Sequence, residues 1–170
     1  AWNNIGDDYD KLAQLETTDE ARTKQYENAI KGFGMSYQIK QNYADAYHNQ
    51  ANIFYKIGRL DLARSGYEKA ISYNPDLYQT YLTLVQIDLM EQNKPELLKH
   101  LVGINRIRPN DLQVGYMTAT AYARIGMLDE AKQLAAAMYQ QLPNVAEIRD
   151  FYNSLNQLIP TESSKSATTK

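Results

Sequence analysis

A recurrence of 34 residues constrains this chain more than any other feature of its sequence. Pro75, Pro109 and Pro143 are spaced at this step, and Gly58 recurs two periods later as Gly126. Within the periods, apolar and small residues fall three or four positions apart, which is the spacing of one buried face on an α-helix. Two such helices fit between successive prolines. A helix pair that recurs at a fixed step indicates a stack of repeats rather than a closed globular domain.

The residues at the repeating positions divide into small and large ones, as interlocking helices require. Small residues such as Gly6, Ala51 and Ala63 permit close approach of two helices, while Phe54 and Tyr67 fill the space between them. A proline at the end of each period stops one helix pair before the next begins. The pattern therefore predicts packing of each helix against its sequence neighbours.

These residues resemble the tetratricopeptide repeat, a family of helical hairpins. The resemblance follows Trp2, Ile5, Gly6 and Tyr9 in the first repeat, Tyr47, Ala51, Phe54, Gly58, Ala63, Tyr67, Ala70 and Pro75 in the second, and Ala119, Tyr122, Gly126, Ala131 and Pro143 in the fourth, and it covers about nine-tenths of the chain. It implies an all-α fold, a right-handed α-solenoid of stacked antiparallel helix pairs with a C-terminal capping helix.

The resemblance also predicts the organisation of the chain. We expect a single domain over residues 1–160 and a flexible tail at 161–170, which lacks apolar residues. The domain would comprise repeat 1 at 1–42, repeat 2 at 43–76, repeat 3 at 77–110, repeat 4 at 111–144 and the capping helix at 145–158.

Two repeats depart from the regular pattern. Repeat 1 contains an insertion of 11 residues, about three helical turns, which preserves the facing of its second helix. We expect that helix to begin at Thr17, in a capping box, to end near Lys40 and to form a long pair that projects beyond its neighbours. Repeat 3 has Asp88 in place of an aromatic residue and Gln92 in place of the turn glycine, which leaves its local packing open.

Composition narrows the functions that such a stack can perform. With a formal net charge of -2, the chain lacks the surplus of Lys and Arg that holds a phosphate backbone, so nucleic acid is not an expected partner. The chain has no Cys, and therefore no disulfide or thiolate metal site. No apolar run approaches the roughly 20 residues of a membrane helix, so direct membrane insertion is not expected. The compartment stays open between bacterial cytoplasm and periplasm.

Candidate catalytic and metal-binding groups are few. His48 and His100 lie in different repeats without further ligands at metal-binding spacing, and Asp7, Asp8 and Asp10 are typical of a solvated acidic face. Neither a glycine-rich phosphate loop nor a Ser/His/Asp arrangement occurs. We expect no enzymatic activity, no cofactor and no metal.

The resemblance places the first helix of every pair along a concave groove. Asn, Gln and Thr side chains there can hydrogen-bond a peptide backbone, and Leu, Met and Tyr can anchor apolar side chains of a partner. Leu89, Met90 and, less so, Tyr116 could instead pack against the adjacent helix. The expected groove residues are Asn3, Asp7, His48, Asn49, Asn52, Tyr55, Lys56, Leu82, Thr83, Gln86, Leu89, Met90, Tyr116, Met117, Thr120 and Arg124.

One use known in the family is disfavoured here. Relatives that hold the acidic C-termini of chaperones share a clamp of Lys, Asn and Arg on this face. The matching residues are Asn3, Asp7, Asn49, Gln79 and Thr83, so the cations are missing and Asp7 would repel a carboxylate.

Two functions of different classes follow. The first is a non-enzymatic scaffold whose groove binds a peptide or helix of a partner protein. The second is a structural or self-assembling segment of a larger protein, membrane-anchored or enzymatic, whose chemistry lies elsewhere. The chain begins without Met inside a helical pattern, so we expect a fragment of a longer protein whose uncapped N-terminal face, with Trp2 and Ile5, supports a homo-oligomer.

Overall fold

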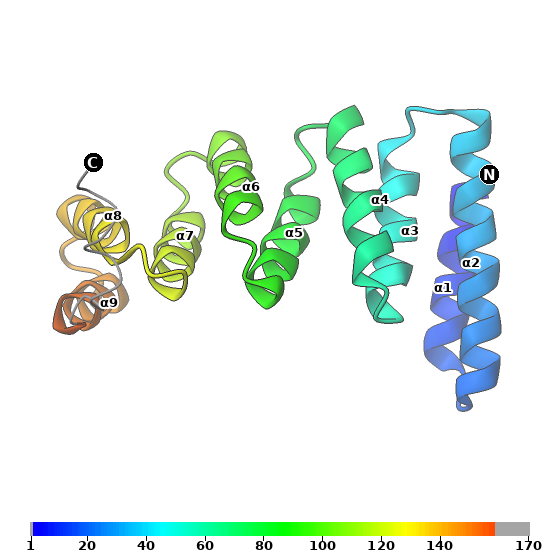
Figure 1. Cartoon of the computed structure of the whole chain (residues 1–170), viewed down its shortest axis with the longest axis horizontal. Helices are drawn as coiled ribbons and strands as arrows, with labels where there is room; N and C mark the ends of the chain where they lie inside the picture. Colours follow the sequence, from blue (N-terminus) through cyan, green and yellow to red (C-terminus); the bar gives the residue numbers. More distant parts are fainter. Residues whose placement is uncertain (1, 159–170) are drawn as a thin grey trace, which may run out of the picture. The chain divides into compact units, whose positions relative to one another are not determined.

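The computed structural model describes residues 2–158, which form nine α-helices and no strand (Figure 1). The all-α prediction is confirmed. The helices are α1 (Trp2–Leu15), α2 (Asp19–Ile39), α3 (Ala44–Lys56), α4 (Leu60–Tyr73), α5 (Tyr78–Glu91), α6 (Lys94–Ile107), α7 (Leu112–Arg124), α8 (Leu128–Gln141) and α9 (Ala146–Gln157). The tail predicted at residues 161–170 lies outside the described residues.

The chain divides into two compact units, Ala1–Ile87 and Asp88–Lys170. The boundary falls within α5, so residues 78–87 of this helix belong to unit 1 and residues 88–91 to unit 2. The single domain over residues 1–160 and its repeat limits stay predictions.

Unit 1 begins with a helix pair in which glycines set the distance between the axes. A Cβ atom on Gly6 would lie 2.6 Å from the Phe33 ring, and one on Gly32 would lie 2.9 Å from the Gly6 nitrogen. Phe33 is buried with Ala29 and Ile53, and these side chains form the core between α2 and α3. The small residue therefore admits the large one, because two side chains could not share this space.

Helix α2 starts two residues after Thr17, the start that the capping-box pattern predicts. The Thr18 hydroxyl accepts a hydrogen bond from the Ala21 amide, so Thr18 is the N-cap and the helix begins at Asp19. It then runs for 21 residues. Figure 1 shows that α1 and α2 extend past α3 and α4 at the end where α1 turns into α2.

Aromatic rings join the next helices of unit 1. Tyr37 of α2 stacks on Tyr47 of α3 with ring centroids 4.3 Å apart, and Tyr73 of α4 contacts Tyr47 at 5.6 Å. Offset rings at these distances add attraction beyond the burial of their area. They hold three successive helices together on one side of the unit.

The turn inside a helix pair repeats in the backbone at the 34-residue step. Gly58, Gln92 and Gly126 have positive φ angles of 76°, 55° and 80°. The amide of the following residue closes each turn: Arg59 donates to Phe54 O (2.8 Å), Asn93 to Asp88 O (2.9 Å) and Met127 to Tyr122 O (2.9 Å). A left-handed residue ends many helices in this way. Gln92 therefore makes the glycine turn without being a glycine.

The atypical Asp88 has a buried partner in unit 2. Its Oδ2 lies 2.6 Å from Nδ1 of His100, and neither side chain is accessible to solvent. A buried charge or polar group is tolerated when such a partner satisfies it. The polar pair occupies a position at which the neighbouring repeats carry Phe54 and Tyr122.

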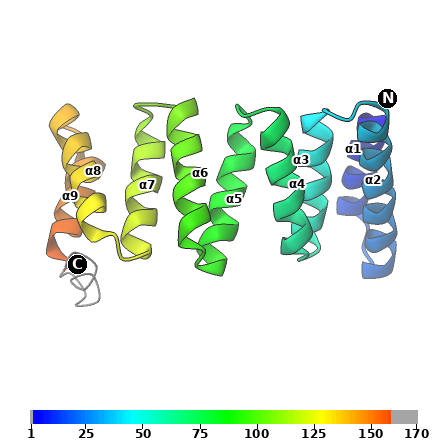
Figure 2. The same ribbon diagram turned by 45° about the horizontal axis from the view of Figure 1, so that its top comes forward.

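Helix α9 covers the end of unit 2, as Figure 2 shows for its place beside α8. Leu155 of α9 is buried with Ala131 and Ala135 of α8, and Phe151 and Tyr152 pack around them. The Tyr152 ring also stacks on Tyr139 at 5.2 Å. One face of α9 thus completes the core while its other face carries exposed polar residues.

We predict that Gln92→Gly raises the free energy of unfolding by about 0.5–1 kcal/mol, because glycine adopts a positive φ without a Cβ clash. Urea denaturation followed by circular dichroism measures the change. Gln133→Gly on the exposed face of α8 is the control, and it should cost about 1 kcal/mol. An equal loss of stability in both variants would contradict the assigned strain.

Candidate functional site

The polar residues predicted for the groove in unit 1 bond to one another across α1 and α3. Asp7 accepts hydrogen bonds from Asn3 Nδ2 (3.1 Å) and from Asn49 Nδ2 (3.0 Å). Lys56 Nζ lies 2.6 and 2.7 Å from the two carboxylate oxygens of Asp10. Burial raises the pKa of Asp7 above its usual value. These side chains therefore join α1 to α3, the first helices of the two pairs.

A second network in unit 1 runs from α4 through α3 to α5. The Tyr67 hydroxyl donates to Asn52 Oδ1 (2.7 Å), which turns the Asn52 amide nitrogen toward His48 Nε2 (3.1 Å). Because Nε2 must accept that bond, Nδ1 carries the ring proton and donates a hydrogen bond to Thr80 Oγ1 (2.8 Å). Burial lowers the pKa of His48 and raises that of Tyr67. His48 and Asn52, both predicted groove residues, are thus packed as a structural relay.

The remaining predicted residues of unit 1 are less engaged. Tyr55 and Leu82 are half-buried, and Gln86 is exposed. The Thr83 hydroxyl donates to the backbone carbonyl of Gln79 one turn earlier (3.2 Å). In unit 1, then, the polar rim of the predicted groove is largely taken up by contacts between helices.

Unit 2 leaves more of its predicted residues accessible. Met90 is 54% exposed and Tyr116 is 47% exposed. The Tyr116 ring contacts Phe151 of α9, with centroids 4.1 Å apart, and the Thr120 hydroxyl donates to the Tyr116 carbonyl (2.8 Å). Packing against a neighbouring helix therefore accounts for part of Tyr116 but leaves about half of its surface open.

A cleft of about 390 Å³ lies among the turns of unit 2, and two of the predicted groove residues line it. These are Leu89 and Arg124, which come from the last turns of α5 and α7. Sequence reasoning missed the other lining residues, Gln92, Lys94 and Ile125, because it placed the groove on helix faces rather than at turns. In the sequence, only Gln92, which replaces the expected turn glycine, pointed to the turn after α5. We call Leu89, Met90, Tyr116, Met117, Thr120 and Arg124 the unit 2 surface.

The N-terminal pair of unit 1 carries a smaller cavity and an exposed apolar face. Trp2, Asn3 and Ile39 help to line a cavity of about 190 Å³. The side-chain oxygen of Asn3 is buried and has no hydrogen-bond partner among residues 2–158. Ile39 is 71% exposed, and further apolar side chains are exposed on α1 and α2. We call Trp2, Ile5, Leu12, Met35 and Ile39 the N-terminal face.

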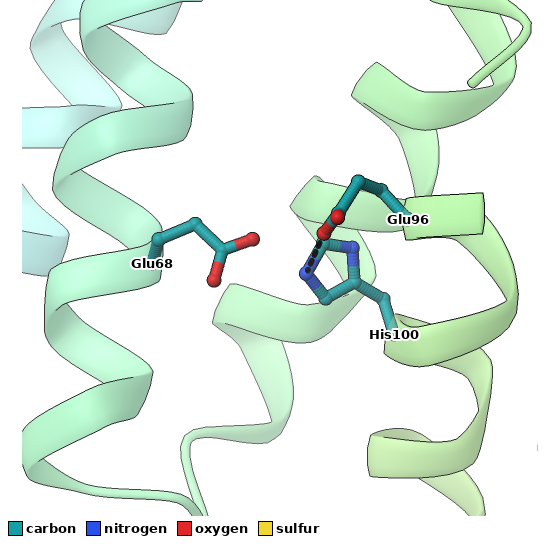
Figure 3. A group of neighbouring side chains, drawn as sticks. All are labelled: Glu68, Glu96 and His100. Carbon is teal, nitrogen blue, oxygen red and sulfur yellow. Dashed lines mark ion pairs between the residues drawn. The ribbon is translucent and has the colours of Figure 1, made fainter.

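Ligands for a metal do not gather within either unit taken by itself. Among residues 2–158, no three His, Cys, Asp or Glu side chains of one unit converge closely enough to share an ion. Figure 3 shows Glu96 and His100 on successive turns of α6, with Oε2 and Nε2 3.9 Å apart, and also draws Glu68 of α4 in unit 1. No described helix combines the length and the apolar character that crossing a membrane requires.

Comparison with known proteins identifies the repeat at the centre of the pattern. A family model described as tetratricopeptide repeat matches residues 44–77, which comprise α3, α4 and the turn between them. None of the curated proteins matches the chain.

Solved structures share the fold at low sequence identity. MamA from Desulfovibrio magneticus RS-1 has a TM-score of 0.62 and 14% identity, over 92% of this chain and 86% of that chain. YrrB, a TPR protein with an unusual peptide-binding site, has a TM-score of 0.61 and 20% identity, over 86% and 74%. A tetratricopeptide repeat protein from Parabacteroides merdae ATCC 43184 has a TM-score of 0.59 and 13% identity, over 86% and 56%. These likenesses confirm the predicted all-α helical-repeat solenoid.

We predict that the relay makes stability depend on His48 protonation. A lowered pKa means that the unfolded chain takes up a proton first, so stability is complete above the usual value of 6.5 and declines as the pH falls through it. Between about pH 7.5 and 5.5, the free energy of unfolding should fall more in the wild type than in His48→Gln. His100 is present in both proteins, so it cancels in the comparison. Equal pH dependence would show that His48 does not titrate differently on folding.

Proposed function

We propose that this chain, a member of the tetratricopeptide repeat family, is a non-catalytic scaffold that binds a segment of another protein on the unit 2 surface. The observation that carries the proposal is the contrast between the units. Polar groove positions of unit 1, such as Asp7 and His48, are taken up by hydrogen bonds between helices, whereas Met90 and Tyr116 of unit 2 stay about half exposed. The peptide-binding site of YrrB, which has the same fold, supports the assignment to this class.

The chemistry of the unit 2 surface suits a protein ligand. Met90 is flexible and polarizable, so it can adapt to different apolar side chains. Tyr116 adds a large ring that is partly immobilised by Phe151, which limits the entropy lost when a partner binds. An extended peptide or one face of a helix can supply the complementary apolar anchors.

The non-catalytic part of the proposal rests on the surroundings of the titratable groups. Asp7 and His48, two of the side chains whose pKa is shifted by burial, are each held by a hydrogen bond with a neighbouring helix. Their shifted pKa values follow from packing, which is a common cause besides catalysis.

We predict that peptides selected on the wild-type chain from a random library bind Met90→Asp at least about tenfold more weakly, because a charge would replace an apolar anchor. Val102→Asp is the matched control, since Val102 is 67% exposed on α6 and lies outside the unit 2 surface. Fluorescence anisotropy measures the affinities. Unchanged binding to Met90→Asp, or an equal loss in both variants, would exclude this surface.

We propose, as a second candidate function, self-association through the N-terminal face. Two of its exposed apolar side chains, Trp2 and Ile39, help to line a cavity, and a covering molecule would bury them together with the rest of the face. This role would suit an assembly segment of a larger protein.

We predict that the sedimentation coefficient of the wild type rises with concentration and that Ile39→Asp removes this rise, because the charge replaces the most exposed apolar side chain of the face. Leu62→Asp on α4 is the control, because Leu62 is exposed outside this face. A wild type that sediments as a monomer at every concentration would contradict self-association.

A further inference from the structure

The cleft of about 390 Å³ in unit 2 combines apolar walls with two cationic side chains. Leu89 and Ile125 supply the apolar part, and Lys94 and Arg124 supply the charges. Both cations are exposed, and Gln92 adds an amide at the same place. All five residues belong to unit 2, in or beside the turns that follow α5 and α7.

The two cations of the cleft have no partner in the described chain. Neither Lys94 nor Arg124 takes part in an ion pair or a side-chain hydrogen bond within residues 2–158. Other cations of unit 2 are paired: Lys99 with Glu96 at 2.9 Å, Arg108 with Asp111 at 3.5 Å and Arg149 with Asp150 at 3.3 Å. The cleft therefore concentrates charge that the fold itself leaves uncompensated.

The 34-residue register shows what chemistry the Arg124 position accommodates. Lys56 stands two periods earlier and binds the Asp10 carboxylate at 2.6 Å. Arg124 has the same place at the end of its helix but lacks such a carboxylate in the described chain. Lys94 is also set apart, because the positions one period before and after it are the apolar Leu60 and Leu128. Packing of the repeat thus does not require a cation there.

We propose that this cleft binds an Asp or Glu carboxylate in the partner's segment, with flanking apolar residues on Leu89 and Ile125. Lys94 and Arg124 would pair with the two carboxylate oxygens, and partial exclusion of water by the apolar walls would strengthen both pairs. The inference rests on the proposed scaffold function and specifies the partner as acidic. The cleft differs from the chaperone clamp of the family, whose positions here are Asn3, Asp7, Asn49, Gln79 and Thr83.

The test uses two phage libraries that share a random apolar background and differ at one central residue, Asp or Asn. Selection on the whole chain should recover binders from the Asp library. For a synthetic binder, replacement of the Asp by Asn should weaken binding at least about tenfold. The double variant Lys94→Glu, Arg124→Glu should show the same loss and should prefer the peptide that has Lys in place of Asp. Raising the salt concentration should weaken the Asp peptide more than the Asn peptide.

Matched controls separate this inference from the scaffold function. Arg149→Glu reverses a charge of unit 2 outside the cleft and should leave affinity unchanged, and circular dichroism checks that every variant is folded. Equal recovery from both libraries, or an equal loss of the Asp and Asn peptides on charge reversal, would overturn the acidic partner. If the acidic preference is absent but the selected peptides still bind Met90→Asp more weakly than they bind the wild type, the scaffold function stands without an acidic partner.

Discussion

The left-handed residue that closes α3, α5 and α7 is the constraint on which the repeated architecture depends. It reverses the chain within a few residues and leaves the second helix antiparallel and close to the first. Close approach then demands small side chains, as at Gly66, where a Cβ atom would lie 2.9 Å from that of Ala51. The tight turn and the small residues at the helix contact are therefore two parts of one geometric requirement.

Polar residues at equivalent repeat positions have different interaction partners because the neighbouring helices carry different residues. Lys56 meets a carboxylate from the preceding first helix, whereas Arg124 does not meet one in the described chain. Similarly, Asp88 takes a position that is aromatic in neighbouring repeats, and His100 balances it inside the core. A repeat tolerates such exchanges when each buried polar atom gains a partner. Individual repeats can thus diverge without loss of the common backbone.

The two units differ in how many of their polar and apolar side chains are taken up by packing. In unit 1, hydrogen bonds between first helices immobilise polar side chains at positions predicted for the groove. In unit 2, flexible apolar side chains remain accessible near a cleft, together with two cations that have no partner within residues 2–158. Ordered polar contacts favour a single conformation, while adaptable anchors and uncompensated charge favour binding. The proposed site therefore lies where the fewest side chains are needed for packing between helices.

The sequence by itself determined the helices, the positions of the turns and the sizes of residues at the contacts, because these follow from local periodicity and from φ preferences. It identified Gln92 and Asp88 as departures but could not state their consequences. Only the tertiary structure decided that Asp7 bonds Asn49, 42 residues away, that His48 joins Thr80, and that Lys94 shares a cleft with Arg124. Such contacts depend on distances between helices of ångström precision, and a pattern of residue types along one chain does not contain those distances.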